Sequence, residues 1–342
     1  MGATLPLIDV AALVDSGAGA DARRAAASAL VGAAERYGFY YAAGHGVDPA
    51  LVARMEALSR TFFALDEAQK LHIPMSAGGR AWRGYFPLGG ELTSNRPDWK
   101  EGLYLGTELP PDHPRVRAGV ILHGPNLWPP IEDFRETVLA YMAALQSLGH
   151  ALMGGIALGL GLPERWFDEH GTADPLILLR LFNYPSRPVP PGAGALWGVG
   201  EHTDYGMLTI LWQDDVGGLE VRTQEGWLAA PPIPGTFVCN IGDMLDRMTG
   251  GRLRSLPHRV GINASGRDRL SIPLFFDPDF DTRIVPVPVA AAGVDDSARR
   301  WDGANLQAFE GTYGEYVTAK VGKVFPDLKQ SVQSTGEGNP SR

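Results

Sequence analysis

The pattern of apolar and polar positions divides this chain into a helix-rich first half and a strand-rich second half. Apolar residues recur at helical spacing in three segments, and the first of these, rich in alanine, is followed by Gly38, a residue type that often ends helices. The third segment is long and amphipathic. The pattern therefore predicts helices over residues 21–37, 49–65 and 131–160, with short strands at residues 5–9 and 39–43.

After residue 174, short apolar runs alternate with turn signals. There are seven such runs in about 100 residues, a density typical of an all-β sandwich or barrel. They cover residues 176–182, 207–212, 219–221, 227–230, 236–241, 259–262 and 270–276. Residues 73–130 are instead rich in glycine, proline and tryptophan, and we expect an irregular segment there, of the kind that often carries function.

The composition is that of a globular protein with an acidic balance. The 342 residues are 44% hydrophobic and have a formal net charge of −9, and no Lys/Arg cluster is longer than a pair. A nucleic-acid partner is therefore not expected. The one cysteine, Cys239, excludes an intrachain disulfide, and no run of 18 apolar residues predicts a membrane span. We expect a cytoplasmic protein for which no obligate protein partner is implied.

Two short segments combine the side chains of a metal site. His202 and Asp204 are two residues apart, and residues at that spacing in an extended chain point to the same face. His258, which precedes another apolar run, supplies a second imidazole. Two histidines and one carboxylate leave open positions on an octahedral Fe(II) ion, as in non-haem iron oxygenases. The same three ligands also suit zinc, so the triad by itself leaves the metal open.

A candidate anion site follows the second histidine. Arg269 and Ser271 come 11 and 13 residues after His258 and again share one face of an extended strand. A guanidinium and a hydroxyl together can hold a carboxylate. A carboxylate site next to a His/Asp/His metal site is what a keto-acid co-substrate needs, because one end of it chelates the iron while the other end is anchored. This combination favours iron over zinc.

These residues lie in motifs that resemble those of a known family. The run from His202 to Gly206, then residues 242–245, 257–260 and 269–271, resembles the isopenicillin N synthase-like 2-oxoglutarate/Fe(II) oxygenases. The resemblance implies a mainly β fold with flanking helices around a double-stranded β-helix, or jelly roll. It also implies Fe(II), 2-oxoglutarate and O2 as cofactor and co-substrates. The activity it implies is a dioxygenase that couples decarboxylation of 2-oxoglutarate to hydroxylation or desaturation of a small molecule.

The resemblance also divides the chain into regions. It predicts an N-terminal dioxygenase region at residues 1–130, a long support helix at 131–173, the jelly-roll core at 174–282 and a C-terminal helical region at 283–329. Residues 330–342 are polar and poor in apolar residues, so we expect a disordered tail there.

Within the family, the bacterial branch that contains ethylene-forming enzyme is the most similar, on the motifs at residues 123–129, 214–219 and 248–251. The family's tyrosine that contacts the distal carboxylate of the keto acid corresponds to Tyr184. Phe182 stands where plant members have an asparagine, and Asn183, offset by one, should face away. The resemblance assigns to Arg180 the contact that this asparagine makes.

The same branch suggests where the primary substrate binds. Glu91 and Thr93 occupy the place of loop residues that face the substrate in ethylene-forming enzyme, and Tyr205 follows the metal-binding Asp204. A pocket with these side chains and Arg180 suits a small polar or amino-acid-like molecule.

Two alternatives stay open at this point. An iron oxidase of isopenicillin N synthase type would use the same metal triad without a keto acid, and its Arg269 and Ser271 would bind a carboxylate of the substrate. A non-catalytic metal-binding protein on the same scaffold is the more remote alternative.

Overall fold

The structure is a computed structural model that describes residues 4–93, 96–188, 196–290, 293, 295, 297–300 and 302–324. Its α-helices are α1 Ala11–Val14, α2 Ala20–Tyr37, α3 Pro49–Ala64, α4 Glu67–Lys70, α5 Pro114–Arg117, α6 Phe134–Gly159, α7 Asp243–Met248 and α8 Tyr313–Val324. Its strands are β1 Leu7–Asp9, β2 Phe39–Ala43, β3 Gly84–Phe86, β4 Leu92–Thr93, β5 Arg96–Pro97, β6 Glu101–Gly106, β7 Leu176–Tyr184, β8 Trp197–His202, β9 Leu208–Gln213, β10 Leu219–Thr223, β11 Gly226–Ala229, β12 Phe237–Ile241, β13 His258–Gly261 and β14 Arg269–Asp277.

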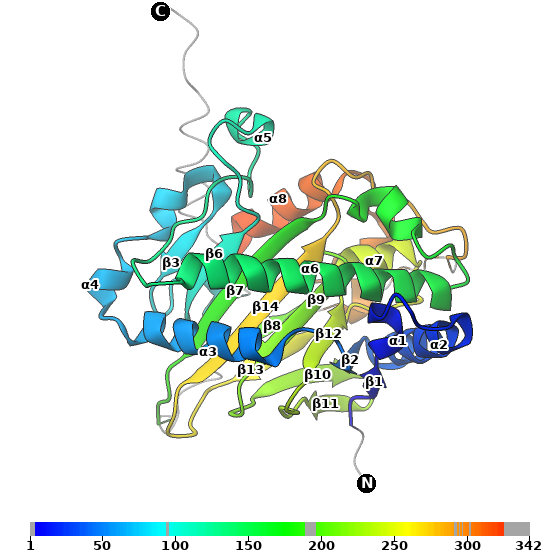
Figure 1. Ribbon diagram of the computed structural model, residues 1–342, viewed down its shortest axis with the longest axis horizontal. Coiled ribbons are helices and arrows are strands. Elements are labelled where there is room, and N and C mark those ends of the chain that lie inside the picture. Colours follow the sequence, from blue (N-terminus) through cyan, green and yellow to red (C-terminus); the bar gives the residue numbers. More distant parts are fainter. Residues whose placement is uncertain are drawn as a thin grey trace, which may run out of the picture.

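The strands form a large and a small sheet (Figure 1). The large sheet has eight strands in the order β1-β2-β12-β9-β14-β7-β6-β3, and the small one has four in the order β11-β10-β13-β8. Strands β4 and β5 form a separate pair. Residues from both sheets line one cavity, as expected for a jelly roll whose two sheets face each other. The predicted fold class, a jelly-roll core with flanking helices, is confirmed.

Helix α6 covers the outer face of the large sheet and contacts β7, β9 and β14 (Figure 1). Every residue of β7 is buried, because α6 packs on one face of this central strand and the cavity wall lies on the other. Helices α2 and α3 pack in turn against α6. Together these helices form a layer on the side of the large sheet that faces away from the cavity (Figure 1).

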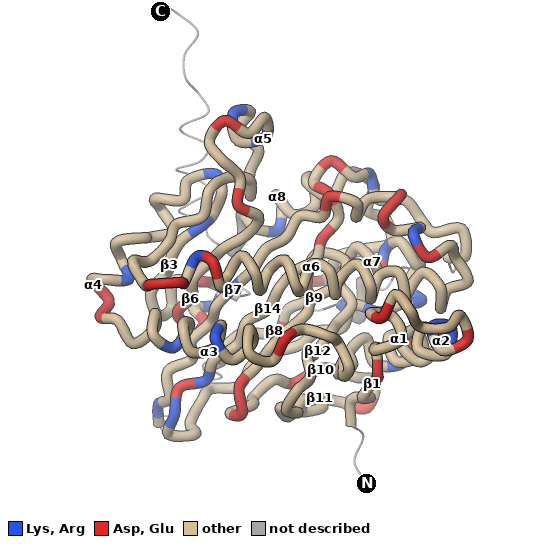
Figure 2. Tube along the Cα trace, viewed as in Figure 1, with Lys and Arg blue, Asp and Glu red and all other residues tan. Residues whose placement is uncertain are grey.

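Helix α6 is also long and apolar enough to cross a membrane by length and composition alone. Its charged residues are confined to Arg135 and Glu136 near its start (Figure 2). However, 56% of its most apolar window is buried inside the protein, mainly against the sheet and the other helices. Its apolar character is therefore explained by its place as a core helix.

The sequence pattern predicted most of these elements. All seven apolar runs after residue 174 are strands, and the three predicted helices are α2, α3 and α6. Gly38 ends α2 in the left-handed conformation, with φ 62°, which glycine adopts at little cost. The third helix begins at Phe134 rather than at residue 131, because Asp133 takes a positive φ of 58° that interrupts the helical conformation.

The prediction of an irregular segment over residues 73–130 was wrong in part. Strands β3 and β6 lie within it and extend the large sheet, β6 beside β7 and β3 beside β6. All six residues of β6 are buried, yet the strand contains a glutamate and two glycines, so its sequence lacks an apolar run. Glu101 is buried because Lys70 pairs with it at 2.6 Å and Tyr85 donates to it at 2.6 Å. Contacts from elsewhere in the chain thus stabilise a strand that local sequence does not reveal.

The predicted division into regions stays a prediction, and its last part, residues 330–342, lies outside the described residues.

Two glycines in helices provide a test of this packing. The Cβ of a Gly149→Ala variant would lie 2.4 Å from Phe276 Cδ2 at the interface of α6 and β14. We expect this variant to be destabilised by about 1–3 kcal/mol through overpacking. Gly32 in α2 has no atom within 4 Å of an added Cβ. Gly32→Ala should stabilise by roughly 0.5–1 kcal/mol, because alanine loses less backbone entropy in a helix. Urea denaturation of both variants checks the pair, and a stable Gly149→Ala would show that α6 does not pack as described.

Candidate active site

A cavity of about 330 Å³ lies between the two sheets and collects most of the predicted site residues. It is lined by strand residues of both sheets, by the segment after β8 and by α8. The predicted site residues on its wall are Glu91, Thr93, Arg180, Tyr184, His202, Asp204, Tyr205, His258 and Ser271. Of the predicted set, Arg269 is buried just behind this wall, being 1% exposed.

The two histidines and the aspartate meet at the edge of the small sheet. His202 is the last residue of β8 and pairs directly with His258, the first residue of β13. Asp204 Oδ1 lies 3.8 Å from His202 Nε2 and 3.7 Å from His258 Nε2. Three ligand atoms so close together can hold one metal ion.

Asp204 presents one oxygen to this centre because its other oxygen is already occupied. Asp204 Oδ2 accepts hydrogen bonds from Thr209 Oγ1 at 2.6 Å and from Asn240 Nδ2 at 2.7 Å. Burial alone would raise the pKa of Asp204, but the two imidazoles and these two donors outweigh it and hold the pKa below its ordinary value. The carboxylate is therefore ionised and fixed in orientation, as a metal ligand requires.

The two imidazoles are oriented in a similar way. His202 Nδ1 lies 2.9 Å from the carbonyl oxygen of Gly200, and His258 Nδ1 lies 3.3 Å from that of Leu256. A carbonyl only accepts, so each Nδ1 carries the proton and each Nε2 keeps a free lone pair. Burial, and then the neighbouring His202, lowers the pKa of His258 to about 4. The His258 imidazole is therefore neutral at pH 7. This donor set suits a divalent metal.

A second polar group lies further along the wall, where β14 pairs with β7. Arg269 stands opposite Tyr184 in these strands, and its guanidinium carbon lies 4.7 Å from the centre of the Tyr184 ring. Arg269 Nη2 donates to Gln213 Oε1 at 3.2 Å, but its Nε and Nη1 have no hydrogen-bond partner among the described residues. Ser271 Oγ donates to Tyr184 Oη at 3.5 Å. A buried cation with two unused donors is costly unless it meets an anion, so this position suits a carboxylate of a ligand.

Strand β7 alternates as the sequence predicted. Arg180, Phe182 and Tyr184 line the cavity, whereas Asn183 donates to Glu101 Oε1 at 2.9 Å and is absent from the described cavity wall. The Arg180 guanidinium stacks on the Tyr104 ring, with 3.5 Å between its carbon and the ring centre. Its Nη1 also donates to two carbonyl oxygens, at 3.1 Å each. Arg180 is thus held rigidly with one side toward the cavity.

The loop residues predicted to face a substrate are buried and already paired. Glu91 Oε2 lies 2.7 Å from Lys100 Nζ, and its Oε1 accepts a hydrogen bond from Tyr104. Thr93 Oγ1 donates to Asp98 Oδ2 at 2.7 Å. Glu91 is 8% exposed, so it is not a solvated loop residue, and it shares the Lys100 ammonium with Asp98, whose Oδ2 lies 2.5 Å from the same Nζ.

Sequence reasoning missed several polar residues of the wall, namely Lys100, Tyr104, Asp277, Asp302, Tyr313 and Lys320. Asp277 could have been found, because the alternation that turns Ser271 toward the cavity continues through Pro273 and Phe275 to Asp277. Lys320 comes from α8, which lies far along the chain and carries no local signal of a site.

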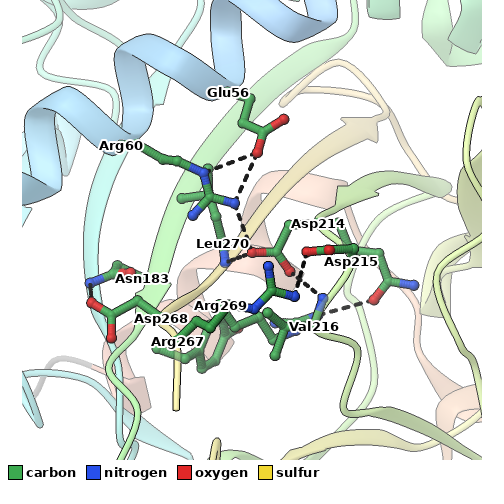
Figure 3. A network of polar contacts seen from close by, with 12 residues as sticks. Glu56, Arg60, Asn183, Asp214, Asp215, Val216, Arg267, Asp268, Arg269 and Leu270 are labelled. Atoms are coloured by element: carbon green, nitrogen blue, oxygen red, sulfur yellow. Dashed lines mark hydrogen bonds and ion pairs between the residues drawn. The ribbon is translucent and has the colours of Figure 1, made fainter. Parts of the chain in front are cut away.

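Figure 3 shows how the start of β14 is held in place. Asp214 Oδ2 accepts from the backbone N–H of Leu270 at 2.6 Å and from Arg60 Nη2 at 3.0 Å. Its Oδ1 accepts from the N–H of Val216 at 3.1 Å. One buried carboxylate thus connects α3, the end of β9 and the residue next to Arg269, and it limits how far the Arg269 backbone can move.

Comparison with known proteins places the chain in a family. Residues 5–131 match the model described as non-haem dioxygenase in morphine synthesis N-terminal, and residues 174–278 match that of the 2OG-Fe(II) oxygenase superfamily. The chain is 49% identical over 354 residues to a probable iron/ascorbate oxidoreductase of Dictyostelium discoideum, with 96% of both chains covered. It is 37% identical over 288 residues to a homoarginine-6-hydroxylase of Oryza sativa, with 83% of this chain and 84% of that protein covered.

A solved structure agrees with this placement. The full-length Neurospora crassa protein crystallised in complex with alpha-KG matches with a TM-score of 0.77 and 27% identity, over 93% of this chain and 95% of that one. The chain belongs to the 2OG-Fe(II) oxygenase superfamily. It is a 2-oxoglutarate-dependent non-haem iron dioxygenase, an oxidoreductase that uses Fe(II), 2-oxoglutarate and O2 and acts on a small molecule. The predictions of the 2-oxoglutarate/Fe(II) oxygenase superfamily and of its cofactors are confirmed.

The Asp214 contacts predict a large loss of stability on truncation. Asp214→Ala leaves the N–H groups of Leu270 and Val216 without their acceptor, and we expect a loss of roughly 2–4 kcal/mol in the free energy of unfolding. The neighbouring Asp215, 74% exposed and paired with the exposed Arg267, is the matched control. Asp215→Ala should change stability by no more than about 0.5 kcal/mol. Equal effects of the two variants in urea denaturation would contradict this role of Asp214.

Proposed function

We propose that this dioxygenase holds its Fe(II) through His202 Nε2, Asp204 Oδ1 and His258 Nε2. What supports the assignment is that the remaining polar atom of each side chain is engaged by a protein group, which leaves these three atoms to face one another. When bound, the iron supplies the site at which 2-oxoglutarate and O2 react. The protein fixes the orientation of the ligands and keeps bulk water out of a mostly buried pocket.

The distal carboxylate of 2-oxoglutarate binds, in this proposal, to Arg269, Ser271 and Tyr184. Its support is the pair of unpartnered guanidinium nitrogens of Arg269, which lie next to the Tyr184 ring. Arg180, fixed by Tyr104, contacts the chelating end of 2-oxoglutarate or the substrate, in place of the asparagine that Phe182 replaces.

The primary substrate is, in this proposal, a small polar or amino-acid-like molecule that is hydroxylated or desaturated. A cavity of about 330 Å³ suits a molecule of that size once 2-oxoglutarate shares it. Glu91, Thr93 and Tyr205 form the polar part of the wall that faces it. The relative described as a homoarginine-6-hydroxylase supports an amino-acid-like substrate.

Two finer assignments belong to this proposal as well. The motifs around residues 123–129 and 214–219 support a kinship with the branch of ethylene-forming enzyme, without implying ethylene as a product. A cytoplasmic enzyme that works without an obligate protein partner is the setting we infer from composition.

The stoichiometry of the reaction tests the proposed function. We expect one succinate to be formed per O2 consumed, with strict dependence on Fe(II) and 2-oxoglutarate, and a gain of about 16 Da in a hydroxylated substrate, the mass of one oxygen atom. His258→Ala should lose succinate formation because one metal ligand is gone. O2 consumption without succinate would instead identify an oxidase of isopenicillin N synthase type, and full function with zinc would identify a non-catalytic metal-binding protein.

A further inference from the structure

The wall of the cavity carries more negative than positive side chains. Among the described residues, four carboxylates and three cationic groups line it, namely Glu91, Asp204, Asp277 and Asp302 against Lys100, Arg180 and Lys320. Fe(II) and the two carboxylates of 2-oxoglutarate balance each other in charge. Arg269, the buried guanidinium proposed to hold 2-oxoglutarate, brings this sum close to zero. A charged ligand is therefore selected by the individual charges that lack a partner.

Most of these charges are balanced by a neighbour. Glu91 Oε2 pairs at 2.7 Å with Lys100 Nζ, an ammonium that Asp98 Oδ2 also contacts at 2.5 Å. Asp302 Oδ2 accepts from Lys320 Nζ at 2.8 Å. Asp204 belongs to the metal triad and is balanced when the metal is bound. Paired charges attract a ligand only weakly, so a carboxylate without such a partner is the better binding site for a cation.

Asp277 is that carboxylate. It is 3% exposed, and its Oδ2 accepts a hydrogen bond from the hydroxyl of Tyr313 in α8. Within the part of the chain that the structure describes, no Lys, Arg or His nitrogen forms an ion pair with it. Burial raises the pKa of Asp277 to about 7, and Arg180, which acts only at longer range, lowers it by less. A cation placed beside Asp277 would stabilise the ionised carboxylate and so offset the cost of burying its charge.

The position of Asp277 is on the substrate side of the proposed metal site. Asp277 is the last residue of β14, six residues after Ser271 on the same face, a separation of about 20 Å along an extended strand. The opposite end of that row holds the proposed 2-oxoglutarate anchor. Asp277 Oδ1 also lies directly against Gly206, where an added Cβ would approach it to 1.4 Å. Gly206 is two residues after Asp204, so Asp277 stands close to the metal-binding segment.

We propose that Asp277, held by Tyr313, binds a cationic group of the primary substrate, either a guanidinium or an ammonium. This inference rests on the proposed function and narrows its substrate class to cationic, amino-acid-like molecules. Tyr313 makes the contact specific, because its hydroxyl donates to one carboxylate oxygen and so fixes the orientation of the carboxylate on the cavity wall.

Binding measured without O2 tests this inference separately from turnover. The Fe(II)–2-oxoglutarate enzyme is titrated calorimetrically with L-homoarginine, with L-homocitrulline, which lacks the guanidinium, and with 6-guanidinohexanoate, which lacks the α-ammonium. Only one of the two analogues lacks the cation that lies next to Asp277. We expect L-homoarginine to bind at least tenfold more tightly than that analogue. The variant Asp277→Asn keeps an oxygen that can accept from Tyr313. It should weaken the binding of L-homoarginine at least tenfold. The affinity for that analogue should change by no more than about twofold, because a charged pair is lost only where a cation was present.

Asp281→Asn is the control, since Asp281 is 76% exposed, pairs with Arg115 and is not among the described residues of the cavity wall. It should change the affinity for L-homoarginine by less than about threefold, as expected for a carboxylate whose charge is already balanced. If the wild-type enzyme binds the three compounds equally or not at all, the inference is overturned, even if Asp277→Asn fails to fold. Equal weakening by Asp281→Asn overturns it too. If the proposed function is wrong, the enzyme forms no succinate in air, whatever affinities the titrations give.

Discussion

Strand β14 is hydrogen-bonded on both sides, to β7 and to β9, and this double pairing fixes the face that each of its side chains presents. Ser271, Pro273, Phe275 and Asp277 face the cavity at two-residue spacing, while the intervening side chains pack into the core beneath α6. A shift of register by one residue would turn this whole row away from the cavity. The bond from the Leu270 N–H to Asp214 anchors the end of β14 that carries Arg269, so the register is held where the proposed co-substrate site lies.

The pairing of buried charges indicates which sites are structural and which await a ligand. Glu101 with Lys70, Asp243 with Arg300, and Asp302 with Lys320 are closed pairs, as buried charges usually are. Among the described residues, Arg269 keeps two nitrogens without a partner, and Asp277 accepts from a hydroxyl but forms no ion pair. These two groups lie near opposite ends of β14. The proposed binding of a keto acid at one end and of a cationic substrate at the other satisfies both.

Much of this site was predictable from sequence because its functional residues occur in pairs that are two positions apart. His202 and Asp204, or Arg269 and Ser271, share a face by the alternation of an extended chain, and the structure places them as that alternation requires. The sequence pattern could not predict strands that have neither an apolar run nor an alternation of apolar and polar residues. Strand β8 contains two glycines, and β6 buries a glutamate whose partner, Lys70, lies 31 residues earlier. Lys320 reaches the cavity only because α8 folds back onto it, a contact without a local signal.

The affinity for 2-oxoglutarate tests most directly whether Arg269 anchors this co-substrate. Calorimetric titration of the Fe(II) enzyme without O2 should show that Arg269→Gln weakens 2-oxoglutarate binding by about tenfold to a hundredfold, the effect of losing a charge-assisted contact worth roughly 1.5–3 kcal/mol. Arg267→Gln, two residues away and 61% exposed, should bind 2-oxoglutarate like the wild type. An unchanged affinity in Arg269→Gln, or an equal loss in both variants, would contradict the account.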